Sequence, residues 1–318
     1  MQDLLKVQNI TKSYKVRTGS LRSKYKQVID GVSFAVGGSK VVAVVGESGS
    51  GKSTLARQLV ALEKPDSGEI FLNGKPLEEC SAVYQKIRMI FQNPMDSLNP
   101  RKRIYEQMEE PLRNFQQLGE KERKDKILST LQRVGLDHFH TTHYPHMFSG
   151  GQRQRIAIAR AIILDPDIVI ADEPVSALDV SVQSQILNLI LELKQEASMS
   201  WVFITHDIGV VKAIADDIIV MYSGRIMEKG PAAEVLEAPL HPYTRSLLDS
   251  VPVIDKLNVI KGMRGTYAST ESVGDESQKQ GCVYHKGCHN ADDLCRSRQP
   301  HEAMLGVRTV ACFHPLQG

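Results

Sequence analysis

Hydrophobic and polar positions along the chain predict strands that alternate with helices on both sides of a long helical stretch. Continuous apolar runs at residues 41–45 and 168–171 are typical of strands buried on both faces of a sheet. Between them, from about residue 104 to residue 163, apolar positions recur at helical spacing. This order predicts an α/β fold with a mainly parallel sheet and an inserted helical subdomain.

Shorter segments extend the pattern toward both ends of the chain. Further strands are expected at residues 4–10, 28–36, 69–72, 88–92 and 201–205, and further helices at 52–62, 181–197 and 208–215. The basic, polar residues 12–26 lack this patterning and are expected to form a loop. The pattern weakens after residue 239, and the polar residues 266–280 are typical of a linker.

Composition and charge exclude several classes of protein. The chain has 318 residues, of which 42% are hydrophobic and 24% charged, as in soluble globular proteins. Lys and Arg number 39 and Asp and Glu number 37, a near balance that argues against a nucleic-acid binder. No apolar run is long enough for a membrane span, and the N-terminus lacks the apolar region of a signal peptide. We therefore expect a cytoplasmic protein, with attachment to a membrane protein left open.

A glycine-rich segment directly after the buried strand at residues 41–45 carries the strongest chemical signal. It fits the pattern G-x-x-x-x-G-K-[ST], with a strand before it and a helix after it. Its backbone N–H groups would face a phosphate, Lys52 would neutralise the β- and γ-phosphates, and the hydroxyl of Ser53 would bind Mg²⁺. The nucleotide-binding residues predicted here are Gly46, Glu47, Ser48, Gly49, Ser50, Gly51, Lys52, Ser53 and Thr54.

An acidic pair, Asp172 and Glu173, follows the buried strand at residues 168–171. The carboxyl ends of parallel strands form the sheet edge at which open α/β folds bind ligands. Beside a phosphate-binding loop, Asp172 is expected to hold Mg²⁺ with Ser53. Glu173 is expected to polarise the water that attacks the γ-phosphate.

The order of these motifs resembles that of the nucleotide-binding subunits of ABC transporters. Residues 148–152 read Phe-Ser-Gly-Gly-Gln before a basic amphipathic helix, and residues 176–179 read Ser-Ala-Leu-Asp after the acidic pair. The resemblance covers at least residues 4–239. It implies a RecA-like P-loop NTPase that hydrolyses ATP with Mg²⁺. It also implies a head-to-tail dimer in which each ATP lies between one phosphate loop and the partner's signature motif.

The resemblance assigns roles to further residues. Gln92 would sense Mg²⁺ and the attacking water, and His206 would contact the γ-phosphate. Asp179 would act across the dimer interface, and Tyr14, with Tyr25 as a rival, would stack on adenine. The signature residues, which would bind the γ-phosphate in the partner's site, are Ser149, Gly150, Gly151 and Gln152.

The same resemblance divides the chain into three structural parts. Residues 1–92 and 166–238 would form the ATPase core, and residues 93–165 the helical signature subdomain. Residues 239–318 would form a C-terminal extension that ends in a cysteine-rich tail.

Three segments narrow the resemblance to the ATPases of dipeptide, oligopeptide and nickel importers. Residues 91–101 and 239–248 resemble segments of these ATPases, and residues 173–183 resemble the second of their two ATPase types. The implied partners are a related ATPase in a heterodimer, two integral-membrane permease subunits and an extracytoplasmic substrate-binding protein, with no nucleic acid. The chain would work as a translocase ATPase on the cytoplasmic face of the inner membrane. A peptide is the expected solute, and nickel or a metal chelate is the alternative.

Four of the five cysteines lie near the C-terminus, at Cys282, Cys288, Cys295 and Cys312. Their pattern, C-x5-C-x6-C-x16-C, lacks the C-x2-C pairs typical of zinc ribbons. Without an export signal, clustered thiolates more often hold a metal than form disulfides. The tail resembles that of peptide-importer ATPases that hold a [4Fe–4S] cluster. Structural Zn²⁺, metal-free thiols and a disulfide are the alternatives. Polar residues 269–280 replace a proline-rich stretch of the family.

Two other classes of function compete with the transporter. A soluble ABC ATPase of translation or DNA repair would carry two cassettes or a long coiled-coil insertion, and neither is seen. A regulatory module that binds ATP without hydrolysis is disfavoured by Glu173 and His206. A third alternative, metal binding by His138, His140, His143 and His146, is disfavoured by their irregular spacing, and we expect these residues to be solvated or packed.

Overall fold

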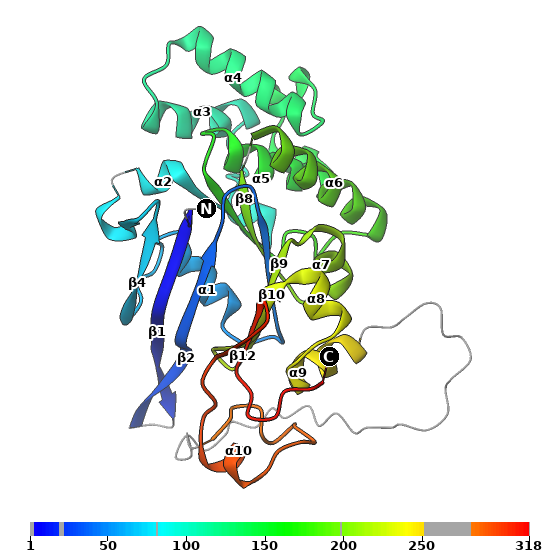
Figure 1. Cartoon of the computed structure of the whole chain (residues 1–318). Helices are drawn as coiled ribbons and strands as arrows, with labels where there is room; N and C mark the ends of the chain where they lie inside the picture. Colours follow the sequence, from blue (N-terminus) through cyan, green and yellow to red (C-terminus); the bar gives the residue numbers. More distant parts are fainter. Residues whose placement is uncertain (1–2, 19–21, 81, 198, 251–280, 318) are drawn as a thin grey trace, which may run out of the picture.

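Two β-sheets form the centre of the fold in a computed structural model that describes residues 3–18, 22–80, 82–197, 199–250 and 281–317 (Figure 1). In spatial order, the large sheet consists of β11 (Ala303–Leu305), β12 (Arg308–Val310), β10 (Arg225–Pro231), β9 (Asp217–Tyr222), β3 (Val41–Val45), β8 (Ser200–Thr205), β7 (Ile168–Asp172) and β6 (Ile87–Ile90). The strands from β9 to β6 are parallel to one another. The predicted α/β fold with a mainly parallel sheet is therefore confirmed.

The small sheet is antiparallel and begins with a long hairpin. Its order is β2 (Arg22–Val36), β1 (Leu5–Thr18), β4 (Ser67–Leu72) and β5 (Lys75–Pro76). The expected loop at residues 12–26 is wrong, because β1 and β2 stay paired as far as Thr18 and Arg22. This outer part of the hairpin projects from the body as a two-stranded ribbon (Figure 1). A ribbon without a buried face needs no apolar alternation, so the pattern of residues could not reveal it.

Two apolar layers cover opposite faces of the large sheet. Alternate residues of β3 point to opposite faces, and Val42 and Val44 pack toward the small sheet and helix α1 (Lys52–Leu59). On the other face, Trp201 and Phe203 of β8 pack into the core that includes helices α5 (Gly150–Ile162) and α6 (Val180–Ala197). Because both faces of β3, β7 and β8 are buried, these strands form a rigid frame for the segments at their carboxyl ends.

The helical stretch predicted at residues 104–163 consists of three helices rather than one continuous segment. They are α3 (Ile104–Phe115), α4 (Glu120–Arg133) and α5, and they lie together at one end of the molecule (Figure 1). The expected helices at residues 181–197 and 208–215 are α6 and α7 (Ile208–Ile214). A short helix, α2 (Val83–Lys86), precedes β6. In the described part of the chain, no helix has both the length and the apolar composition that a bilayer span requires.

The C-terminal part contains more regular structure than the sequence pattern indicated. Strands β9 and β10, helices α8 (Ala232–Glu237), α9 (Pro242–Asp249) and α10 (Asp293–Ser297), and the hairpin of β11 and β12 were not expected. β12 pairs with β10, so the end of the chain adds strands to the large sheet. The linker expected at residues 266–280 lies outside the described residues.

Candidate functional site

The phosphate-binding loop joins the carboxyl end of β3 to the start of α1. Two of its glycines are required by close contacts as well as by positive φ angles. A Cβ on Gly46 would lie 2.1 Å from the carbonyl oxygen of Met221, and a Cβ on Gly51 would lie 2.6 Å from that of Val28. The loop is therefore pressed against the ends of neighbouring strands, and any larger residue at these positions would displace it.

Lys52 lies inside this loop, with only 6% of its surface exposed. Its Nζ donates hydrogen bonds to the carbonyl oxygens of Gly46 at 2.7 Å and Glu47 at 2.8 Å. Burial is the largest influence on the pKa of Lys52 and lowers it, although Glu173, Asp172 and Glu47 favour the charged form. The ammonium group of Lys52 thus lies at the point where the loop would surround a phosphate.

The hydroxyl of Ser53 and the carboxylate of Asp172 form a pair of oxygen ligands beside Lys52. Ser53 Oγ donates to Asp172 Oδ1 at 3.3 Å. Asp172 ends the buried strand β7 and is 8% exposed. Burial raises the pKa of Asp172 above its ordinary value, although the Ser53 hydrogen bond and Lys52 act in the opposite direction. Hydroxyl and carboxylate oxygens are hard ligands of the kind that Mg²⁺ prefers.

Glu173 has a strained backbone, with a φ of 47° in the left-handed region. Its N–H donates to the carbonyl oxygen of Ile204 at 2.9 Å, which holds this conformation against β8. The carboxylate accepts a hydrogen bond from Gln92 Nε2 at 3.1 Å and lies 3.2 Å from His206 Nδ1. The structure therefore brings the three predicted catalytic residues into one cluster beside the phosphate loop. Backbone strain of this kind is common at functional sites.

The signature residues 149–152 lie at the start of helix α5. Ser149 Oγ accepts from the N–H of Gln152, and Gln152 Oε1 accepts from the N–H of Ser149, which together cap the helix. Ser149 and Gly150 are exposed. Among the described residues, no hydrogen bond or ion pair joins residues 149–152 to the phosphate loop.

Asp179 and Tyr14 each have a local partner. Asp179 Oδ1 accepts from Ser181 Oγ at 2.7 Å and from the N–H of Val182 at 2.9 Å, which caps the start of α6 and lowers the pKa of Asp179. Tyr14 Oη donates to Glu63 Oε2 at 2.6 Å. Its rival, Tyr25, is 69% exposed on the hairpin. The roles predicted for Asp179 and Tyr14 in nucleotide binding stay predictions.

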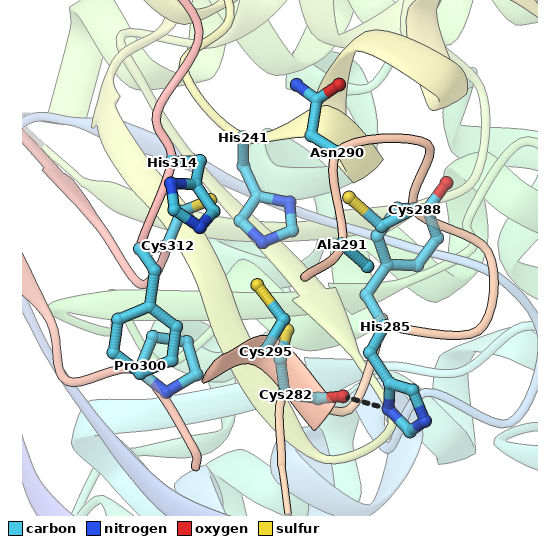
Figure 2. Close-up of a pocket in the computed structure, with 12 residues that line it drawn as sticks. His241, Cys282, His285, Cys288, Asn290, Ala291, Cys295, Pro300, Cys312 and His314 are labelled. Atoms are coloured by element: carbon cyan, nitrogen blue, oxygen red, sulfur yellow. Dashed lines mark hydrogen bonds between the residues drawn. The ribbon is translucent and has the colours of Figure 1, made fainter. Parts of the chain in front are cut away.

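The four C-terminal cysteines line one small pocket (Figure 2). All four are free thiols, and Cys282 and Cys295 are buried. Burial, reinforced by the three other thiols, raises the pKa of Cys312 to about 11. The structure therefore gathers side chains that are separated along the sequence into a single group of sulfur atoms, which we call the cysteine pocket.

Three histidines at this pocket, His241, His285 and His314, were not predicted from the sequence. His241 is 1% exposed, and its Nε2 has no hydrogen-bond partner among the described residues. His314 Nε2 lies 2.9 Å from Asp292 Oδ2, and the ligand atoms of Asp292, Cys295 and His314 lie within 4.8 Å of one another. The only sequence signal for His241 was its place in residues 239–248, a segment already linked to peptide importers. The histidines of residues 138–146 pack with aromatic rings, His140 and His143 lying against Phe148.

Family models match two parts of the chain. Residues 29–176 match the model described as ABC transporter. Residues 227–295 match the model described as oligopeptide/dipeptide transporter, C-terminal region. The second match includes Cys282, Cys288 and Cys295.

Curated relatives are similar along nearly the whole chain. The chain is 43% identical to a di/tripeptide transport ATP-binding protein, DppF, of Pseudomonas aeruginosa, over 100% of this chain and 99% of that protein. It is 45% identical to the dipeptide transport ATP-binding protein DppF of Escherichia coli, over 98% and 94% of the two chains. It is 41% identical to the oligopeptide transport ATP-binding protein AppF of Bacillus subtilis, over 94% and 93%.

Solved structures share the fold of the larger part of the chain. The protein cbiO1 of Clostridium perfringens, part of an ABC transporter complex, is 28% identical to this chain with a TM-score of 0.66. The matched region covers 74% of this chain and 92% of cbiO1. The ATP-binding cassette MJ0796, a dimer bound to ADP and phosphate after hydrolysis, is 30% identical with a TM-score of 0.63. The matched region covers 72% of this chain and 98% of MJ0796.

Proposed function

Because this chain belongs to the family of ABC transporter ATP-binding proteins that serve dipeptide and oligopeptide transport, we propose that it hydrolyses ATP to drive peptide import through membrane permease subunits. The observation that carries the proposal is the cluster at the carboxyl ends of β3, β7 and β8. There, Ser53 contacts Asp172 and His206 contacts Glu173. Both carboxylates favour the charged form of Lys52. The names of the relatives favour a peptide over the nickel alternative.

The proposed reaction is an attack of water on the γ-phosphate of ATP. Backbone N–H groups of the loop and Lys52 would hold the β- and γ-phosphates, and Ser53 and Asp172 would hold Mg²⁺, which neutralises phosphate charge. Glu173 would accept a proton as the water oxygen bonds to phosphorus and the bond to the β-phosphate oxygen breaks. Gln92 and His206, both in contact with the Glu173 carboxylate, would orient it. The products are ADP and phosphate.

We propose that a second, related ATPase completes each site. Ser149 and Gly150 are exposed at the start of α5, where backbone N–H groups and the helix dipole favour a phosphate. In the described structure they do not reach the phosphate loop of the same chain. A head-to-tail dimer accounts for both features. The likeness of residues 173–183 to the second ATPase type supports a related ATPase as the partner, on the cytoplasmic face of the inner membrane with two permeases and an extracytoplasmic binding protein.

Transport assays test this function and the identity of the partner together. Proteoliposomes that contain both permeases, the binding protein, this chain and the related ATPase should take up a labelled dipeptide only when ATP is enclosed on the cytoplasmic side. Omission of the related ATPase should abolish uptake. Equal uptake with this chain as the only ATPase would refute the heterodimer, and ATP-dependent uptake of nickel but not of peptide would select the alternative solute.

We also propose that the cysteine pocket holds a [4Fe–4S] cluster. Four thiols at one pocket supply the ligand set of a cubane cluster, and the buried ring of His241 lines the same space. A group bound there would tie together Cys282, helix α10 and the end of the chain. The competing arrangement is a Zn²⁺ ion held by Asp292, Cys295 and His314, which offer the mixed oxygen, sulfur and nitrogen ligands that zinc accepts.

Two matched variants distinguish these metal sites, because Cys288 belongs only to the first group and Asp292 only to the second. Anaerobically purified Cys288→Ser should lose nearly all iron and sulfide, whereas Asp292→Asn, which keeps a helix-capping side chain, should retain them. Metal analysis and the visible spectrum provide the measurement. Loss of zinc from Asp292→Asn, with zinc retained by Cys288→Ser, would assign the metal to the second group instead.

A further inference from the structure

A tyrosine outside the predicted nucleotide site contacts the phosphate loop. Tyr243, in α9, accepts a hydrogen bond at 3.0 Å from the N–H of Glu47. Tyr243 is 1% exposed, and burial raises the pKa of its hydroxyl, so this group stays neutral and able to accept. The contact joins two segments that lie far apart in the sequence.

The same peptide unit of the loop is held from both sides. The N–H of Glu47 and the carbonyl of Gly46 belong to one planar peptide group. Tyr243 contacts its N–H, and Lys52 Nζ donates to its carbonyl oxygen at 2.7 Å. Rotation of this peptide would therefore break both hydrogen bonds, and the Tyr243 hydroxyl fixes the acceptor that orients the catalytic lysine.

Tyr243 is in turn fixed by His241. The N–H of Tyr243 donates to His241 Nδ1 at 2.9 Å. The N–H groups of Leu240 and His241 each donate to the buried carboxylate of Glu228 at 2.9 Å. Because Nδ1 accepts a hydrogen bond, the proton of the neutral ring lies on Nε2. The His241 ring lines the cysteine pocket (Figure 2).

A second contact leads from the cysteine pocket to the same tyrosine. Tyr284 lies between Cys282 and Cys288 in the sequence and lines the pocket. Its ring centroid is 5.2 Å from that of Tyr243 and 5.9 Å from that of His241. The side chains that surround the four thiols therefore also pack around the residue that holds the phosphate loop.

We propose that Tyr243 is a positioning residue of the nucleotide site and that His241 connects it to the cysteine pocket. The contacts run from the pocket to the His241 ring, from that ring to the backbone N–H of Tyr243, and from the Tyr243 hydroxyl to the peptide between Gly46 and Glu47. This inference requires ATP binding by the loop but does not depend on which metal the cysteines hold. A change in the pocket alters the phosphate loop through these two side chains.

Nucleotide affinity of the full chain tests the role of Tyr243. Tyr243→Phe removes only the hydroxyl and should weaken binding of Mg-ATP, measured with a fluorescent analogue, about fivefold to tenfold, as expected for one lost hydrogen bond in a partly buried site. In the assembled complex, KM for ATP should rise while kcat changes less than twofold. Tyr222→Phe is the matched control, since its ring packs 4.6 Å from that of Tyr243, and it should change affinity less than twofold. Wild-type affinity in Tyr243→Phe, or equal losses in both variants, would overturn the proposal.

A double-mutant cycle tests the connection through His241. His241→Ala should weaken Mg-ATP binding about threefold in the wild-type background and less than 1.5-fold in the Tyr243→Phe background, because its effect passes through Tyr243. Independent, additive losses would refute the connection. Hydrogen exchange of wild-type peptides that cover residues 41–52 gives a check that needs no variant. Slow exchange of the Glu47 amide is expected, and rapid exchange would contradict the contact.

Discussion

Replacement of Glu173 by glutamine should reduce ATP turnover at least about a hundredfold while ATP binding stays within roughly threefold of wild type. Glutamine keeps the length of the side chain and its contacts with Gln92 and His206, but it cannot accept the proton of the attacking water. Lys52 and the Ser53–Asp172 pair, which would hold the phosphates and Mg²⁺, are unchanged. Phosphate release at saturating Mg-ATP, measured with the chain assembled with its partners, gives the turnover, and equilibrium titration gives the affinity.

The proposed mechanism also predicts that this variant accumulates a closed dimer with bound ATP, since hydrolysis would remove the γ-phosphate that bridges the two subunits. Size-exclusion chromatography with Mg-ATP should detect it. Glu196→Gln is the matched control, because Glu196 lies on α6 in a surface ion pair with Arg133, away from the site. Near-normal turnover in Glu173→Gln, or an equal loss in Glu196→Gln, would rule out Glu173 as the base.

The phosphate loop and the acidic pair could be predicted from the sequence because their determinants are local. Gly46 to Thr54 follow a short apolar strand, and Asp172 and Glu173 end another, so a few neighbouring residues define each motif. The contact of Gln92 and His206 with Glu173 required the resemblance to a family, because the three residues come from different strands. The local pattern of residues predicts strand ends but not which strands lie side by side.

Other features depend on tertiary contacts that leave little trace in the pattern of residues. The outer part of the β1–β2 hairpin has no buried face, and its lysines concealed the strands. Strand β12 is three residues long and is held by pairing with β10. His241 caps the short helix α9 and Tyr243 lies in its first turn, and the role of both depends on the residues that pack against them. A buried neutral histidine and a buried tyrosine resemble ordinary core residues until their partners are known.

The ionised carboxylate of Asp172 lowers the free energy of unfolding of the chain, because it is buried. Burial raises its pKa above the ordinary value, and this direction already includes the opposing effects of Ser53 and Lys52. A carboxyl with a raised folded-state pKa favours the folded state while it is protonated. Its contribution to the free energy of unfolding is fully present below the unfolded-state pKa of about 3.9 and is lost as the pH rises through the folded-state pKa. The full cost of the ionised form is therefore present above the folded-state pKa of Asp172.

Asp172→Asn should consequently make the nucleotide-free chain more stable and the enzyme inactive. Asparagine can still accept the Ser53 hydrogen bond but supplies no charge for Mg²⁺, so turnover should fall roughly a hundredfold or more. Urea unfolding should give a higher midpoint than wild type at about pH 7, and the difference should shrink as the pH falls and wild-type Asp172 becomes protonated. Asp125→Asn, on the exposed face of α4, is the control and should change neither midpoint nor turnover appreciably. A lower midpoint for Asp172→Asn near neutral pH would mean that the ionised carboxylate stabilises the fold. The inference that ionised Asp172 destabilises the fold while it serves Mg²⁺ binding would then be wrong.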